Sequence, residues 1–221
     1  MKVKKLLVVL TAGVISLELC PLAARASVGI LAPSGGSANI GSPGTGIAGT
    51  QLYDSGALAW SNGSGYSGTL ETVVYQNDSD NTLGGDTFEF IISNAASSID
   101  VIDRLRLGPW STGIVYVDNY NPLVTGISAT EATRSASGTI GFDWNSTEIP
   151  AGGYGIVIVQ TSFTGPVALQ TVYIDDNTAD GTGQALLPDP VPETPTMMAG
   201  ALLLLPFGAS VLRILCKKLV A

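Results

Sequence analysis

Short stretches of alternating apolar and polar residues, separated by turn-forming clusters, begin at Gln51 and constrain the fold more than any other feature. Phe88, Phe90 and Ile92 recur at every second position, which is the period that places side chains on one face of a strand. Clusters rich in Asn, Asp and Ser, such as 77–81, separate these runs and are typical of turns. No ten-residue stretch of this region keeps a helical period with caps. The pattern therefore predicts an all-β domain.

Seven runs carry the clearest strand pattern, at 69–76, 86–93, 98–107, 113–119, 137–144, 155–163 and 167–175. Many short strands with regular turn signals are typical of a single antiparallel β-sandwich, and we expect about seven to nine strands over 51–187. Residues 27–50 are rich in Gly, Ser and Pro and are expected to form a loose arm. Within it, Gly44 to Gly49 matches G-x-G-x-x-G. A dinucleotide site would need a strand before this motif and a helix after it, and neither is predicted.

The N-terminus has the three parts of a secretory signal peptide. Residues 1–5 carry three lysines, and an apolar run follows at 6–17. The small residues Ala24 and Ala26 stand at the two positions that a signal peptidase reads. The apolar run is too short to cross about 30 Å of hydrocarbon as a helix. We predict that signal peptidase removes 1–26 and that the rest of the chain is exported.

The C-terminal part combines a proline-rich linker, an apolar segment and a basic end. Prolines recur through 188–195 and predict an extended linker, because each one restricts its backbone and removes a hydrogen-bond donor. Apolar residues follow and lead into Arg213, Lys217 and Lys218. This pattern predicts a transmembrane helix within 196–221, with its basic end in the cytoplasm.

The linker motif Val191-Pro192-Glu193-Thr194-Pro195, the apolar segment and the basic end together resemble the PEP-CTERM sorting tail. The motif reads Pro-Glu-Thr where the family has Pro-Glu-Pro, and one arginine and two lysines replace an arginine run. The resemblance covers about thirty residues. It implies a Gram-negative-type envelope, a host that makes exopolysaccharide, and processing by an exosortase, a membrane protease-transpeptidase. It also implies a protein held in the inner membrane before processing and then found at the cell surface or outside the cell.

The predicted mature region is acidic and lacks the usual catalytic side chains. Residues 27–195 contain seventeen acids and three arginines, a net charge of −14, with no histidine, cysteine or lysine. This charge repels phosphate and argues against nucleic-acid binding. Ser-His-Asp, Cys-His and Ser-Lys catalysis cannot be built, and zinc, copper and haem lose their usual ligands. A carboxylate pair would suffice for glycoside hydrolysis, but the spacing of Asp100, Asp103, Asp143 and Glu148 does not select one.

Two Asp-rich turns contain oxygen ligands of the kind that Ca²⁺ prefers. One holds Asp78 and Asp80, and the other holds Asp176 and Asp180. Neither has EF-hand spacing, and residues of these types are common in turns for backbone reasons alone. We treat the four carboxylates as weak calcium candidates and expect no cofactor.

Aromatic residues offer a second kind of binding chemistry, a platform for sugar rings. Trp110 and Tyr120 lie beside predicted loops, where binding residues are common. Trp144 ends an alternating run and is expected in the core. The other candidates for such a platform are Trp60, Tyr66, Tyr116 and Tyr154.

These features favour an exported, non-enzymatic structural protein of the cell surface or extracellular matrix. Its expected partners are signal peptidase, exosortase and the membrane that holds the C-terminal helix. An exopolysaccharide-binding module that uses loop aromatics and carboxylates is the alternative. A carboxylate-dependent glycan hydrolase is the third and least favoured reading.

Overall fold

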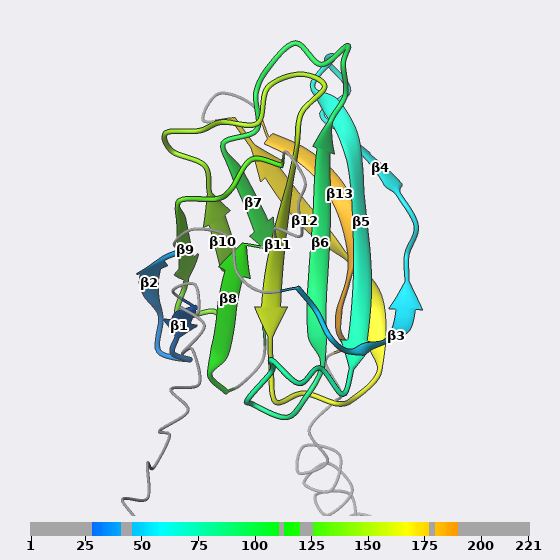
Figure 1. The fold of residues 1–221 in the computed structure, drawn as a ribbon. Helices are drawn as coiled ribbons and strands as arrows, with labels where there is room; N and C mark the ends of the chain where they lie inside the picture. Colours follow the sequence, from blue (N-terminus) through cyan, green and yellow to red (C-terminus); the bar gives the residue numbers. More distant parts are fainter. Residues whose placement is uncertain (1–27, 41–45, 111–112, 120–125, 177–179, 190–221) are drawn as a thin grey trace, which may run out of the picture.

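The computed structural model describes residues 28–40, 46–110, 113–119, 126–176 and 180–189, and these residues form an all-β domain (Figure 1). The strands are β1 (Gly29–Leu31), β2 (Gly36–Asn39), β3 (Thr50–Asp54), β4 (Leu58–Ser61), β5 (Ser67–Gln76), β6 (Thr87–Asn94), β7 (Arg104–Leu107), β8 (Val115–Asn119), β9 (Glu131–Arg134), β10 (Ile140–Asp143), β11 (Tyr154–Gln160), β12 (Val167–Asp175) and β13 (Asp180–Pro188). The predicted all-β class is therefore confirmed.

All strand pairs are antiparallel and belong to one sheet, which is nearly closed into a barrel (Figure 1). The order is β1-β8-β11-β6-β5-β4-β13-β12-β7-β10-β9-β2, and β3 pairs with β5 beside this path. The front and back of the molecule are joined where β4 meets β13, through the single residue pair Ser61 and Thr182. The described residues thus form one continuous, nearly closed sheet, which corrects the expected β-sandwich of two separate sheets.

The sheet has 13 strands, so the expected seven to nine were too few. The unexpected strands are β1, β2, β3, β4, β9 and β13, and most of them have only three to five residues, too few to display an alternating pattern. β13 is longer, but Gly181 and Gly183 occupy buried positions where apolar side chains would mark a strand. A Cβ on Gly183 would lie 2.8 Å from the Cβ of Trp60, so these glycines leave room for the buried indole.

The expected loose arm is corrected for residues 28–40, which supply β1 and β2. β1 pairs with β8, and β2 pairs with β9. The small residues that suggested an arm serve close packing instead, because a Cβ on Gly29 would lie only 2.8 Å from the Cβ of Ala38. The strand expected over 98–107 is also shorter, since only Arg104–Leu107 joins the sheet.

The core lies between the front and back of the curled sheet. Phe88 and Phe90 of β6 both pack against Trp110, with ring centroids 5.1 and 6.4 Å away. Trp144 is fully buried, as predicted, and its Nε1 donates to the carbonyl oxygen of Ile127 at 3.0 Å. Each large side chain of this kind contributes about 1.5–3 kcal/mol when removed from water.

Arg134 of β9 ties together segments from three parts of the chain. Its guanidinium donates hydrogen bonds to the carbonyl oxygens of Gly113 at 2.6 Å, Trp110 at 3.0 Å and Leu31 at 3.4 Å. Burial lowers the pKa of this guanidinium. Arg134 thus links β9 to β1 and to the chain between β7 and β8, close to where the sheet nearly closes.

The predicted signal peptide with Ala24 and Ala26, the sorting motif 191–195 and the basic end lie outside the described residues. The same holds for the predicted transmembrane helix. Within the described part of the chain, no helix has the length and apolar character that a membrane crossing requires.

Candidate functional site

The outer side of β12 presents exposed side chains in a line. Leu169, Thr171 and Tyr173 occupy alternate positions of this strand and point away from the core, where Val172 and Ile174 are buried. Leu169 is 48 % exposed and Tyr173 is 46 % exposed. An aromatic ring and an aliphatic side chain thus stand on the open surface of a central strand.

Tyr173 is held beside Arg106 of the neighbouring strand β7. The two residues are opposite each other in the ladder, and the guanidinium carbon lies 5.4 Å from the ring centroid. Arg106 is itself fixed by Asp175, because its Nη2 donates to Oδ1 at 2.8 Å and its Nε lies 2.5 Å from Oδ2. This hydrogen bond raises the pKa of Arg106. A carboxylate therefore orients the cation that packs on the exposed ring.

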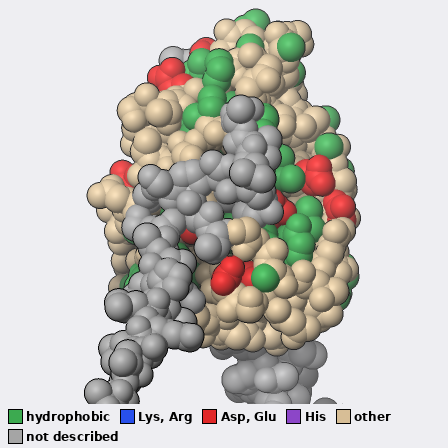
Figure 2. All heavy atoms as spheres, in the orientation of Figure 1, with side chains coloured by type: hydrophobic (Ala, Val, Ile, Leu, Met, Phe, Trp, Pro, Cys, Tyr) green, Lys and Arg blue, Asp and Glu red, His purple; other side chains and the backbone are tan. Residues whose placement is uncertain are grey.

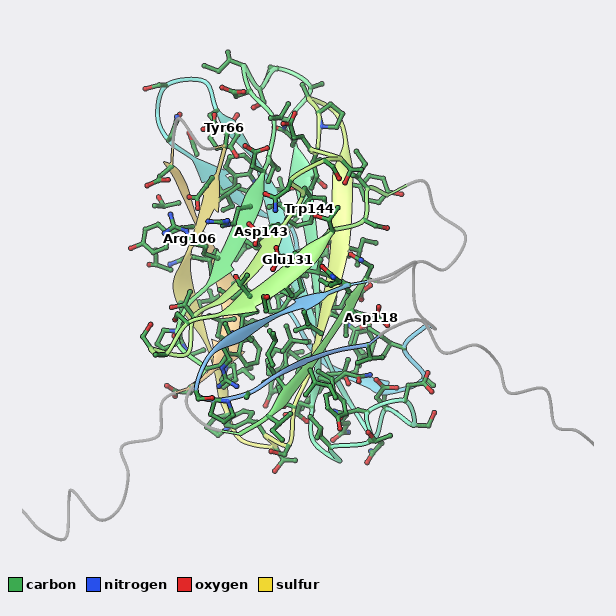
Figure 3. The ribbon with its side chains drawn as sticks, turned by 90° about the vertical axis from the view of Figure 1, so that its left-hand side faces the viewer. Tyr66, Arg106, Asp118, Glu131, Asp143 and Trp144 are labelled. Atoms are coloured by element: carbon green, nitrogen blue, oxygen red, sulfur yellow. The ribbon has the colours of Figure 1, made fainter. Side chains whose placement is uncertain are left out.

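A row of charges continues across the sheet from this point. Arg104 of β7 is paired with Asp143 of β10, which stands opposite Glu131 of β9. Figure 3 shows Arg106, Asp143 and Glu131 in succession across these strands. Asp180, 3.5 Å from Arg106, adds another carboxylate at the other end. Acids thus outnumber the two arginines, and an approaching anion is repelled.

A shallow hollow lies on the outer side of β4, β5 and β6. Its volume is about 340 Å³, and its lining residues are Ala59, Trp60, Ser61, Ser67, Gly68, Thr69, Ser93 and Ala95. Most of these are small, and the accessible lining of the hollow is mostly apolar, with only a small polar part. Charged side chains are not among its lining residues.

The exposed side chains of β12 form a surface that consists of Leu169, Thr171 and Tyr173, which we call the β12 surface. Paired residues of neighbouring strands connect it to the hollow. Ser67 stands opposite Ser61, Ser61 opposite Thr182, and Thr182 opposite Tyr173. This row of paired positions, which we call the hydroxyl row, continues to Arg106. It therefore runs from the hollow across β4 and β13 to the exposed tyrosine.

Tryptophans and tyrosines named from the sequence are mostly buried. Trp110 lies in the loop after β7, as expected, but it is 3 % exposed and packs on Phe88, so its ring is not open to a sugar. Trp60 and Tyr66 meet edge to face inside the domain, with centroids 4.8 Å apart. Tyr120 lies outside the described residues. Tyr116 and Tyr154 are half-buried. Among the described residues, the most exposed aromatic side chains are those of Tyr53 and Tyr173.

Asp78 has its two carboxylate oxygens engaged by the surrounding chain. Oδ1 accepts from the backbone N–H groups of Ala48 and Asp80, each at 3.2 Å, and Oδ2 accepts from the Thr87 hydroxyl at 2.8 Å. Asp176 is buried, whereas Asp180 is exposed beside Arg106. Among the described residues, no group of three or more acidic side chains could hold a metal ion. The geometry of Asp78 is that of a turn-forming residue.

Two buried carboxylates lie on the outer side of the part of the sheet formed by β8, β11 and β6. Asp118 of β8 is opposite Ile158 of β11, which is opposite Glu89 of β6, so the two acids are about 10 Å apart across the strands. Burial raises the pKa of Asp118 to about 6, and burial also raises the pKa of Glu89. The Tyr75 hydroxyl donates to Glu89 Oε2 at 2.8 Å. The spacing of acids in the sequence does not single out either of them.

The chain matches no family model, no curated protein and no solved structure. The site is therefore defined by its own geometry. Alternation within 167–175 is the sequence signal that could have put Leu169 and Tyr173 on one face. The pairing of Tyr173 with Arg106 has no local signal, because the two residues belong to different strands.

Proposed function

We propose that the chain is an exported, non-enzymatic protein of the cell surface or extracellular matrix. This proposal rests mainly on what the arginines of the described domain do, because all of them bind groups of the fold itself. Arg104 and Arg106 pair with carboxylates, and Arg134 binds backbone carbonyl groups, which leaves an excess of acids at the surface. On the face seen in Figure 2, acidic side chains are visible but no lysine or arginine of the described residues. An acidic surface of this kind repels nucleic acid and anionic lipid.

In this proposal, the two ends of the chain direct its export and its sorting to the cell surface. Signal peptidase removes 1–26, and a helix within 196–221 holds the protein in the inner membrane. Exosortase then recognises the motif 191–195 and releases the domain to the cell surface or medium. The support is the resemblance of the tail to PEP-CTERM signals, together with the basic end after the apolar segment.

Intact-mass measurement of the native protein from host membranes and from the medium tests this route. We expect a mature species that begins at Ser27 and ends within 192–195, with any added mass identifying a group joined at the new C-terminus. A Glu193→Ala variant should accumulate in the membrane fraction with its tail. A wild-type protein that retains Lys217 and Lys218 in every fraction would overturn the sorting part of the proposal.

An exopolysaccharide-binding module is the second candidate function, and the exposure of Tyr173 beside Arg106 favours it. A carboxylate-dependent glycan hydrolase has less support. Asp143, one of the acids considered for that role, is paired with Arg104. Binding of a labelled polysaccharide without turnover would separate the module from the hydrolase.

A further inference from the structure

We propose that the β12 surface and the adjoining hollow form one binding site for a neutral polysaccharide chain. Tyr173 is the platform on which a sugar ring stacks, and the hydroxyl row guides the polysaccharide toward the hollow at Ser61. The inference rests on the second candidate function and is independent of how the protein is exported or sorted.

The aromatic ring of Tyr173 is held ready to stack against a sugar. Sugar rings have an apolar face of C–H groups, which packs on an exposed aromatic face. Tyr173 is exposed on a central strand, and Arg106 lies against its ring. Because Asp175 fixes Arg106 through two short contacts, less side-chain freedom remains to be lost when a ligand binds. Leu169 extends the apolar surface along the same strand.

Hydrogen-bonding groups lie beside the ring. Thr182 lies next to Tyr173 in the ladder, and Ser61 lies beyond it, about 10 Å from Tyr173 across two strand spacings. Ser67 continues the row into the hollow of about 340 Å³. Hydroxyl groups act as both donors and acceptors, as sugar hydroxyls require. The row is long enough to contact more than one sugar unit.

The charges around the site favour a neutral polysaccharide. Asp175 and Asp180 surround Arg106, so its positive charge is already balanced by carboxylates. Arg104 balances Asp143 in the same way, and Glu131 adds a further negative charge on β9. A polysaccharide that carries uronate or sulfate groups would be repelled here. A protein partner would favour a larger apolar centre than Leu169 and Tyr173 provide.

The experiment measures binding of the purified full-length protein to polysaccharides by affinity electrophoresis and titration calorimetry. The neutral probes are dextran, galactomannan, hydroxyethyl cellulose and the neutral fraction of the host's extracellular polysaccharide. Alginate is the anionic probe. We expect binding to at least one neutral probe, no binding to alginate, and about tenfold weaker binding by Tyr173→Ala.

Tyr53→Ala is the matched control, because Tyr53 is 44 % exposed but lies on β3, outside this site. It should bind as the wild type does. Ala59→Leu, which fills the hollow, should also weaken binding, and circular dichroism and thermal melting should show that each variant is folded. Failure of every probe to bind, alginate included, would overturn both the module and the site. Equal binding by Tyr173→Ala, or tighter binding to alginate, would overturn the site alone, whereas the mass measurement tests sorting separately.

Discussion

Gly29 and Ala38 make a close approach between β1 and β2, because a Cβ on Gly29 would lie 2.8 Å from the Cβ of Ala38. The same Cβ would lie 2.9 Å from Cγ2 of Val117 on β8. β1 and β2 are the first and last strands of the sheet order, so this contact lies where the sheet nearly closes. Small side chains are required at this point because β1 and β2 lie very close together.

Gly29→Val should therefore open the closure and destabilise the fold. Overpacking of this kind costs about 1–3 kcal/mol. Urea unfolding followed by tryptophan fluorescence measures the loss. Ile30→Val is the control on the same strand, since Ile30 is 61 % exposed and should change stability little. A Gly29→Val protein as stable as the wild type would contradict the required close approach.

Arg134→Lys should destabilise the protein by about 2 kcal/mol, although it keeps the charge. Lysine presents a single ammonium group and cannot reproduce the planar set of donors that reaches Gly113, Trp110 and Leu31. Buried carbonyl groups that lose their partners cost about 1–3 kcal/mol. Thermal and urea unfolding measure the change. Arg104→Lys, at an exposed position on β7, is the comparison and should cost less.

Asp118→Asn should stabilise the protein above pH 6 and have little effect below pH 4. Burial raises the pKa of Asp118 to about 6, above the value of about 3.9 for an unfolded chain. The folded state therefore favours the neutral form, and stability is lost as pH rises between these two values. This shift corresponds to about 3 kcal/mol, and solvent screening of the carboxylate reduces the expected gain at pH 7.5 to about 2 kcal/mol.

Urea unfolding of Asp118→Asn and wild type at pH 4 and pH 7.5 measures this difference. The amide keeps an oxygen that can accept from the Asn119 N–H, as Oδ1 of Asp118 does at 2.7 Å. Asp54→Asn, which removes a charge from exposed strand β3, controls for net charge. Equal stabilisation at both pH values would show that the burial of a charge is not the cause.

Tyr66→Phe should leave stability unchanged or raise it by about 1 kcal/mol. The ring is fully buried, and its hydroxyl has no hydrogen-bond partner within the part of the chain that the structure describes. Burial raises the pKa of this hydroxyl, with Asp176 adding to the effect. Removing a buried hydroxyl without a partner removes a desolvation cost and keeps the contact with Trp60.

Differential scanning calorimetry of Tyr66→Phe measures the effect. Tyr75→Phe is the contrasting variant, because the Tyr75 hydroxyl donates to Glu89 at 2.8 Å and its loss should destabilise. A large loss of stability in Tyr66→Phe would indicate that its hydroxyl does bind a partner in solution.

Strand periodicity identified the longer elements because it is a local property of the chain. The run 167–175 matches β12 in both its ends, and Phe88, Phe90 and Ile92 lie on the buried face of β6. Strands that lack an alternation of apolar and polar residues do not show this periodicity. In β13, Gly181 and Gly183 are glycines because the side chain of Trp60, which is far away in the sequence but on the neighbouring strand β4, occupies the space beside them.

The amino-acid sequence by itself determined the all-β class, the acidic charge and the restricted chemistry of residues 27–195. These follow from composition and from a period of two along each strand. Only the tertiary structure decided that Tyr173 stands against Arg106 and shares a row with Thr182 and Ser61. Arg106 and Ser61 lie on strands that are far from β12 in the sequence. The local hydrophobic pattern sets which face a side chain occupies, whereas its partner on such a strand depends on how the whole sheet curls and how its core packs.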